Sequence, residues 1–326
     1  GTLDRHHAES WTDIGGIGKH QQLRVDLHDI DRLINHDFRV MSSVVDSKES
    51  GFLDLVIEDA YGSYPARFKP EAPIKASSLI GNVHQMWGFP IDHEHPEVGL
   101  LIDFMEEPEN KDPNLLVVPR SACVDEAVPA LHGLIDILDQ MPSQPIAGLV
   151  HRVLGSDNVY PYFFKARASR EAHHAFPGGL AIHSHECAVT VAGLSAAQFA
   201  NQESKDTAIA AAILHDLGKI EWSRSAYNNP LITHETRSVI EISTELPRLR
   251  AETHAACADM LTYLISKEAR CEHAACPEAV AVAMSDRLSA TRDGQIAAFK
   301  ASPRHYATAD RRLNGQLKRY IRIQDR

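Results

Sequence analysis

The spacing of apolar residues changes once along this chain, from short strand-like runs before residue 105 to helical spacing after residue 113. Between these two parts lies a segment rich in proline and glutamate, residues 106–113. Proline and clustered polar residues interrupt regular structure and are typical of linkers. The sequence therefore predicts the α+β class, with a strand-rich part followed by an all-helical part.

The N-terminal part has short apolar runs separated by turn residues, at 38–41, 51–57, 65–68, 83–89 and 98–104. Short strands with glycines where they must bend are typical of small closed barrels. We therefore expect an OB-like β-barrel over residues 31–110, with a fragment of a β-sandwich as the alternative. Residues 1–30 show little periodicity and predict an extended or partly ordered arm.

Beyond the linker, apolar residues recur three and four positions apart, which places them on one face of a helix. The first such helix carries Ala127, Leu131, Leu134, Ile135 and Leu138. Similar patterns follow at 146–153, 188–195, 208–214, 236–246, 253–266 and 277–290. An all-α domain is expected over residues 120–300. Residues 301–326 form a C-terminal extension with a short helix, and from residue 300 onward the chain has eight lysines and arginines against two aspartates.

Composition narrows the class of protein. Of the 326 residues, 44% are hydrophobic and 24% are charged, as in ordinary soluble proteins. There is no apolar run of about 18 residues and the first residues are polar, so neither a membrane span nor a signal peptide is expected. Five cysteines without CxxC spacing favour a reducing cytoplasm over disulfides or structural zinc. The net charge of −11 argues against coating of duplex DNA but allows a local basic groove for single strands.

His215 and Asp216 are adjacent at the end of an apolar helical run. One explanation is that both simply end a helix before Gly218. However, a carboxylate near the C-terminal end of a helix opposes the helix dipole, and a bound cation would offset that cost. An imidazole nitrogen and a carboxylate oxygen side by side are also suitable ligands for one divalent ion.

Two further residues are candidates for the same ion. Asp286 ends an apolar helical stretch, where a buried carboxylate needs either a metal or Arg287 as a partner. His183 follows a Pro-Gly-Gly turn, whose tight backbone geometry would place it at the start of the next helix. A packing or capping role is the alternative for His183. Together, His183, His215, Asp216 and Asp286 predict a site for Mn, Mg or Fe.

Other polar residues are weaker candidates. His234 and His254 could each complete a second metal site or lie on a helix surface. Lys219 could contact a phosphate oxygen, although a lysine at a helix end is also common. The candidates for binding a nucleic-acid backbone are Lys165, Arg167, His173 and His174. Histidines in polar contexts are expected to be solvated, namely His6, His7, His20, His28, His36, His93 and His95.

The order His183, His215-Asp216, Asp286 resembles the HD superfamily of metal-dependent phosphohydrolases, whose H…HD…D pattern lies on an all-α core. The flanking stretches are similar to those of YhaM-type 3′→5′ exoribonucleases, which join an OB-fold to an HD domain. They are at residues 162–168, 173–185 and 214–221. The His-His…Pro-Gly-Gly-Leu…His-Ser block is also similar to the HD part of MobH/TraI-type conjugative relaxases.

The resemblance implies that His183, His215, Asp216 and Asp286 hold the first metal ion. It also implies that His234 serves a second ion in members with two metals. The chain departs from the family where paired histidines are expected before the last helix, and His254 is the remaining candidate there. The number of ions, one or two, therefore stays open. The Gly-Tyr-Pro element of cyclic-di-GMP enzymes is absent, which argues against that substrate.

The expected reaction is attack of a metal-activated hydroxide on a phosphodiester, with Asp216 and Lys219 as the candidate catalytic residues. The first hypothesis is a 3′→5′ exonuclease on single-stranded RNA or DNA, with Trp87, Phe89 or Tyr61 as base-stacking platforms. The second is a nucleotide phosphohydrolase whose barrel serves in oligomerisation. The third is a non-catalytic DNA-transfer or scaffold protein.

Two features rank these hypotheses. The third is disfavoured because every ligand of the first metal site is kept. The strand-rich part favours the exonuclease, since a free nucleotide needs no long groove. The expected partner is single-stranded nucleic acid and no membrane, and exposed strands could support a homo-oligomer.

Overall fold

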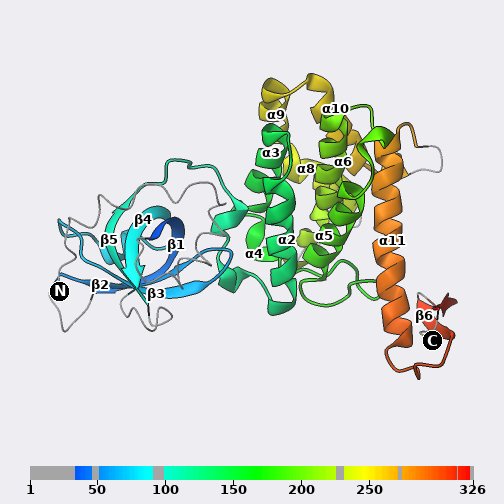
Figure 1. Cartoon of the computed structure of the whole chain (residues 1–326), viewed down its shortest axis with the longest axis horizontal. Helices are drawn as coiled ribbons and strands as arrows, with labels where there is room; N and C mark the ends of the chain where they lie inside the picture. The colour runs from blue at the N-terminus through cyan, green and yellow to red at the C-terminus, as the bar shows by residue number, and fades with distance from the viewer. Residues whose placement is uncertain are drawn as a thin grey trace. The chain divides into compact units, whose positions relative to one another are not determined.

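The computed structural model describes residues 34–45, 51–90, 99–224, 231–270, 274–313 and 315–323. They fall into two compact units, within Gly1–Ser121 and Ala122–Arg326, and Figure 1 shows the strands of the first and the helices of the second. Several predictions concern residues outside these ranges: the arm at 1–30, and His6, His7, His20, His28, His93 and His95.

The first unit contains five described strands, β1 (Ile34–Val45), β2 (Leu53–Glu58), β3 (Ser63–Phe68), β4 (Val83–Pro90) and β5 (Leu100–Glu106). They form a closed barrel in the order β1-β2-β3-β5-β4 (Figure 1). All neighbours are antiparallel except β3 and β5, which run parallel and need a crossover that β4 provides. The predicted OB-like barrel is confirmed.

The barrel closes because its strands alternate between inside and outside. In β2, Leu53, Leu55 and Ile57 are buried in the barrel core, while Asp54 and Val56 between them face outward. The long strand β1 pairs with β2 and with β4, and a register shift near its middle lets it bend from one partner toward the other. Each strand therefore has one apolar side, which faces the barrel core.

One prediction, that His36 is solvated, is wrong. This residue was expected to be solvated, but it is buried in β1 with its Nε2 3.0 Å from Asp59 Oδ2. The other oxygen of Asp59 accepts hydrogen bonds from the backbone N–H groups of Tyr61 and Gly62. The buried histidine thus has a carboxylate partner in a turn far along the chain. A polar sequence context did not reveal that partner.

The second unit is helical, which confirms the α+β class. Its α-helices are α2 (Val128–Asp139), α3 (Gln144–Leu154), α4 (Tyr160–Phe163), α5 (Gly179–Ala192), α6 (Gln202–Leu214), α7 (Glu221–Arg224), α8 (His234–Ile242), α9 (Leu246–Glu252), α10 (Ala255–Ile265) and α11 (Pro277–Phe299). Two of its short 3-10 helices matter below, η8 (Leu217–Ile220) and η9 (Lys267–Arg270).

Helix α6 is the centre of the helical unit. It packs against α3, α5, α10 and α11, and all residues from Asp206 to Leu214 are buried. Many of these residues are alanines, whose small side chains let neighbouring helices approach closely. Helix α5 also packs against α2 and α11. Helices α5, α6 and α11 therefore all pack against one another.

The C-terminal end differs from expectation. Strands β6 (Thr308–Leu313) and β7 (Gln316–Ile321) form a two-stranded antiparallel sheet, which contacts α11. The predicted short C-terminal helix is therefore wrong. Residues of β6 alternate between exposed and half-buried, a period of two that its many charged residues hide in the sequence. Among the described helices, none combines the length and apolar character needed to traverse a bilayer.

Candidate metal centre

The turn before α5 has the tight geometry that the sequence predicts. Gly178 has a φ of 81°, in the left-handed region that favours glycine, and α5 begins at the next residue. A Cβ on Gly179 would lie 2.1 Å from the carbonyl oxygen of His174, so only glycine permits this approach. The segment that carries His173 and His174 is thereby held against the start of α5, near His183.

The other candidate ligands come from α6 and α11. His215 is the C-terminal cap of α6, and Asp216 follows with φ −104° and ψ 8° at the junction with η8. Asp286 was expected at the end of a helix, but α11 continues to Phe299, so Asp286 lies within it. The junction between α6 and η8 and the middle of α11 thus meet the first turns of α5.

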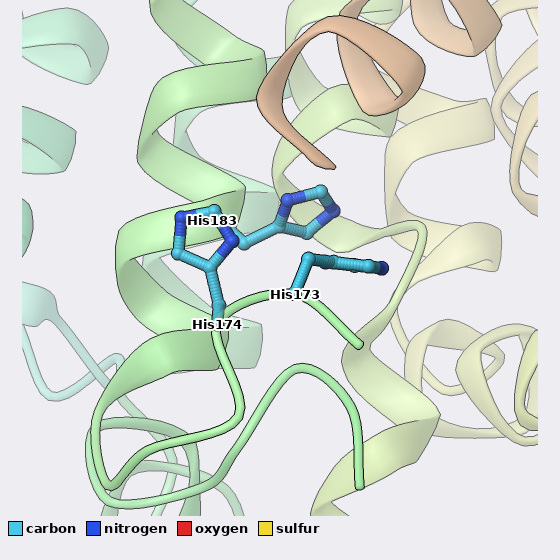
Figure 2. A group of neighbouring side chains, drawn as sticks. All are labelled: His173, His174 and His183. Carbon is cyan, nitrogen blue, oxygen red and sulfur yellow. The ribbon is translucent and has the colours of Figure 1, made fainter. Parts of the chain in front are cut away.

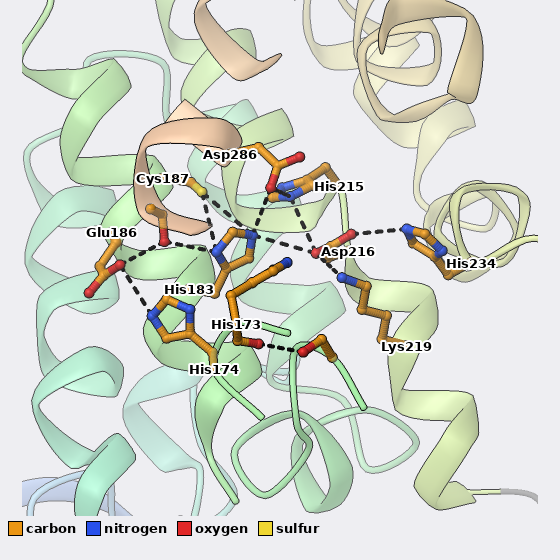
Figure 3. A network of polar contacts seen from close by, with 12 residues as sticks. His173, His174, His183, Glu186, Cys187, His215, Asp216, Lys219, His234 and Asp286 are labelled. Atoms are coloured by element: carbon orange, nitrogen blue, oxygen red, sulfur yellow. Dashed lines mark hydrogen bonds and ion pairs between the residues drawn. The ribbon is translucent and has the colours of Figure 1, made fainter. Parts of the chain in front are cut away.

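Four side chains converge at this place (Figure 3). His183 Nε2 lies 3.5 Å from Asp216 Oδ2 and 3.3 Å from Asp286 Oδ1. His215 Nε2 lies 3.5 Å and 3.9 Å from the same two oxygens. The two histidines and Asp216 are buried, while the Asp286 side chain is 28% exposed. The structure therefore brings together all four residues that were predicted to hold the first metal ion, with Asp286 toward solvent.

Hydrogen bonds at the opposite ring nitrogens set the tautomers of both histidines. Ser289 Oγ donates to Glu186 Oε2 at 2.6 Å, so it accepts from His183 Nδ1–H at 2.9 Å. His215 Nδ1–H donates to the carbonyl oxygen of Ala212 at 2.8 Å. Each Nε2 therefore keeps its lone pair and directs it toward the carboxylates, which is the arrangement of metal-binding histidines.

The buried donor atoms fit a divalent cation. His215 Nε2 is buried without a hydrogen-bond partner. A buried polar atom left without a partner costs about 1–3 kcal/mol, and coordination of an ion would remove that cost. Two imidazole nitrogens with two carboxylates suit Mn, Fe, Mg or Zn. These four residues could therefore hold such an ion.

The ionisation of the donors also favours a cation. Burial lowers the pKa of His215 to about 4, so its imidazole is neutral at neutral pH. Burial by itself raises the pKa of the Asp216 carboxyl, but its contacts with His215 and the Lys219 ammonium outweigh burial and hold that pKa well below its usual range. Burial also raises the pKa of the Asp286 carboxyl, but its contacts with His183 and His215 outweigh burial, so that pKa is lowered too. Neutral imidazoles and ionised carboxylates are the metal-binding forms.

The two oxygens of Asp216 face different neighbours. Oδ2, which faces the two buried histidines, also accepts a hydrogen bond from Lys219 Nζ at 2.5 Å. Oδ1 lies 3.2 Å from His234 Nε2, which is itself 3.3 Å from Glu235 Oε1. Lys219 and His234, both predicted site residues, thus belong to the cluster. His234 contacts the side of Asp216 that a second ion would use.

His173 and His174 lie on the α5 side of the cluster (Figure 2). Their ring nitrogens and those of His183 come within 4.8 Å of one another, so these three could also hold an ion. Burial, together with the nearby His183 and Lys219, lowers the pKa of His173 to about 4. His174, with a φ of 47°, lies 3.3 Å from Glu186 and supports it rather than facing the carboxylates.

Cys187 forms another candidate group with His183 and His215. Its Sγ lies 3.8 Å from His183 Nε2. Burial raises the pKa of the Cys187 thiol well above its usual value, so the sulfur stays protonated and is a poor ligand. The set of two histidines and two aspartates is therefore the better donor set.

Three predicted residues lie on the surface instead. Lys165 and Arg167 are exposed just after α4. His254 is exposed at the start of α10, where its Nδ1 accepts a hydrogen bond from the backbone N–H of Ala256. Among the described contacts, none joins these three to the cluster. A role for Lys165 and Arg167 in binding nucleic acid, and for His254 in a second metal site, stays a prediction.

The sequence analysis missed four members of this network. Glu186 lies three residues after His183, and Ser289 lies three residues after Asp286, so each shares a helix face with a ligand. That spacing was a usable signal. Glu235 and Arg270 carry no such signal, because the contacts of Arg270 with Asp216 and with Glu235 join distant parts of the chain.

A comparison with protein-family models identifies the domain in which this cluster lies. Residues 180–291 match the family model of the HD domain, and the match includes His183, His215, Asp216 and Asp286. The helical unit contains an HD domain. No curated protein and no solved structure shows significant similarity to the chain. The HD domain indicates a metal-dependent phosphohydrolase, whereas the finer likeness to exoribonucleases and relaxases stays a prediction.

Proposed function

We propose that this protein is a metal-dependent phosphodiesterase that removes nucleotides from the 3′ end of single-stranded RNA or DNA. The observation that carries the proposal is the convergence of the Nε2 atoms of two histidines and two ionised carboxylates within the HD domain. A divalent cation bound there would lower the pKa of a water molecule and neutralise charge on a phosphate.

The protein's own residues would hold and orient the reactants. His183 and His215 are aimed by Ser289 and by the Ala212 carbonyl, so their Nε2 atoms need no rearrangement to bind the ion. His173 is neutral because its pKa is about 4, and its imidazole can accept a hydrogen bond from a water or a sugar hydroxyl. The partly exposed Asp286 lies on the side from which a substrate can approach.

The barrel supports a nucleic-acid substrate. Trp87 and Phe104 lie side by side on β4 and β5, with ring centroids 5.2 Å apart, and Phe104 is 51% exposed. Aromatic side chains on a barrel surface stack on bases, at about 1–3 kcal/mol per base. Phe52 is a further platform, since the cations of Arg67 and Lys69 lie 5.7 Å and 5.2 Å from its ring centroid.

A second candidate is hydrolysis of free nucleotides. Exposed Asp103 and Glu106 lie near Phe104 on β5, and their negative charges would repel a nucleic-acid backbone. This observation favours a barrel that does not bind nucleic acid, and hence a small substrate in the HD domain. The experiment below separates the two candidates.

The test offers the protein, in Mn²⁺, single strands of RNA and DNA with a free or a blocked 3′ end, and separately nucleoside triphosphates. We expect stepwise shortening of strands with a free 3′ end and protection of the blocked strands. Hydrolysis of the triphosphates with both kinds of strand intact would replace the first candidate by the second.

Asp216→Ala should lower the cleavage rate by at least about a hundredfold, because the carboxylate faces both sides of the cluster. The matched control is Asp259→Ala, which removes an exposed carboxylate from α10 that pairs with Arg250. Cleavage rates and melting temperatures should be measured for both variants. A folded Asp216→Ala protein that cleaves at the wild-type rate would rule out this site.

A further inference from the structure

Arg270 is the one cation of η9 that reaches the cluster among the described contacts. Its Nη2 lies 3.6 Å from Asp216 Oδ1, and its Nη1 lies 3.7 Å from Glu235 Oε1 and 3.8 Å from Asp286 Oδ2. Nη2 also donates to the backbone carbonyl of His215 at 3.5 Å. A single guanidinium is thus placed among three carboxylates that come from three different elements.

Arg270 contacts the oxygens of Asp216 and Asp286 that would not bind a first ion. His183 and His215 face Asp216 Oδ2 and Asp286 Oδ1, so the opposite oxygens are free for another cation. His234 Nε2 is buried without a hydrogen-bond partner and lies 3.2 Å from Asp216 Oδ1. A second metal ion would need these same donors, and the guanidinium of Arg270 already lies among them.

The charges favour one metal ion over two. The carboxylates of Asp216, Glu235 and Asp286 face the cations Lys219 and Arg270, which leaves one negative charge in excess. One divalent ion would turn this excess into one positive charge, which matches a phosphodiester. A second divalent ion would have to lie beside Arg270 among the same oxygens, where the two cations would repel each other.

We propose that Arg270 takes the place of a second metal ion in this HD domain. The site then binds one divalent cation between His183, His215, Asp216 and Asp286, and the guanidinium supplies the other positive charge to the substrate phosphate. Its contacts of 3.6–3.8 Å are longer than tight hydrogen bonds, and its side chain is 22% exposed, so N–H groups remain for phosphate oxygens. The contact with substrate rests on the proposed function, whereas the number of metal ions does not.

The first experiment counts metal ions. Metal-free full-length protein is dialysed against Mn²⁺, and bound manganese per chain is measured by elemental analysis. We expect one ion in the wild type and in Arg270→Lys, which keeps the positive charge. Arg270→Gln should bind two ions, because the freed oxygens and His234 can then hold a second one. The matched control, Lys267→Gln, removes an exposed charge from the same 3-10 helix and should bind one.

The second experiment measures binding of inorganic phosphate to the Mn²⁺-loaded proteins by calorimetry. The phosphate affinity of Arg270→Gln should differ from that of the wild type. The affinity of Arg270→Lys should lie close to the wild-type value, and that of Lys267→Gln should equal it. At one equivalent of Mn²⁺, where no second ion is available, we expect the affinity of Arg270→Gln to fall at least about tenfold. Circular dichroism of each variant checks that it is folded.

Three results would overturn the inference: two manganese ions in the wild type, one ion in Arg270→Gln, or an unchanged phosphate affinity in Arg270→Gln at one equivalent of Mn²⁺. These results are independent of nuclease activity. If the metal counts and phosphate affinities come out as expected but no oligonucleotide is shortened, the proposed exonuclease function fails and the role of Arg270 stands.

Discussion

The two imidazoles of the candidate metal centre are oriented by groups that lie behind them. A backbone carbonyl, that of Ala212, orients His215. His183 depends instead on a series of side chains, from Ser289 Oγ to Glu186 and on to His174 (Figure 3). A substitution can remove a side chain but not a carbonyl. The orientation of His183 is therefore the more vulnerable of the two.

Ser289→Ala should weaken metal binding by about 10–100-fold, because His183 Nδ1–H loses its acceptor and the ring is free to turn. Ser285→Ala is the matched control, since this buried hydroxyl of the same helix donates to the Val282 carbonyl instead. Affinity for Mn²⁺ can be measured by competition with a chelator. Equal losses in both variants would mean that the effect comes from helix α11 rather than from His183.

How much of the centre the sequence predicts depends on where each residue lies. His215-Asp216 could be found because adjacent His and Asp in a buried run need a compensating cation, and the structure brings His183 and Asp286 to them. Arg270 could not be found, because its ion pair with Asp216 joins residues that no helical spacing relates. Contacts across distant elements depend on the packing of the whole helical unit.

At the scale of elements, the contact between α8 and η8 positions His234. Gly218 N–H donates to Ser238 Oγ at 2.8 Å, and Ser238 Oγ contacts the carbonyl oxygens of His215 at 3.0 Å and His234 at 2.9 Å. A Cβ on Gly218 would lie 2.1 Å from the His234 carbonyl oxygen. The first turn of α8 therefore stays close to Asp216 only while residue 218 has no side chain.

Gly218→Ala should lower the free energy of unfolding by about 1–3 kcal/mol, because the added methyl forces α8 away from η8. Urea denaturation of the wild type and the variant provides the measurement. The control is Gly148→Ala, where a Cβ would come no closer than 3.0 Å to another atom, the end of the Arg152 side chain, and a smaller loss is expected. Wild-type stability of Gly218→Ala would show that the contact tolerates a methyl group.

The elements themselves were predictable where apolar residues repeat regularly. The short apolar run at 51–57 predicted β2 correctly, and helical spacing predicted α2 and α3. Helix α5 begins at Gly179, as the Pro-Gly-Gly turn before His183 predicted, although its apolar spacing is regular only from Ala188, because polar side chains interrupt that spacing on its first turns. Turn residues can thus mark the start of a helix whose first turns are too polar for apolar spacing to show it.

At the scale of the whole molecule, the chain has two separate cores, one in the barrel and one in the helical unit. The four metal-binding candidates all belong to the helical unit. The two-part α+β organisation could be predicted from the change in apolar spacing. A small closed barrel was also expected from the short strands and their turns. The parallel pairing of β3 with β5 was not, because it depends on a register that the sequence pattern does not specify.

Calorimetry should therefore resolve two unfolding transitions, of which Mn²⁺ raises only one. With free Mn²⁺ at about a hundred times its dissociation constant, the helical unit should gain about 2.7 kcal/mol. His215→Ala removes one ligand and should abolish most of that gain, while the other transition stays where it was. An equal shift of both transitions by Mn²⁺, or no shift of either, would contradict this assignment.

The β6–β7 pair has a consequence for how copies of this protein meet one another. In the barrel every strand has a neighbour on both sides, but a sheet of two strands offers backbone N–H and C=O groups along its outer edges. Leu317 and Ile321 on β7 are exposed, and apolar side chains there would favour pairing of this edge with another chain. Arg311 on β6 and Lys318 on β7 lie opposite each other, and their like charges would oppose the stacking of one hairpin on another.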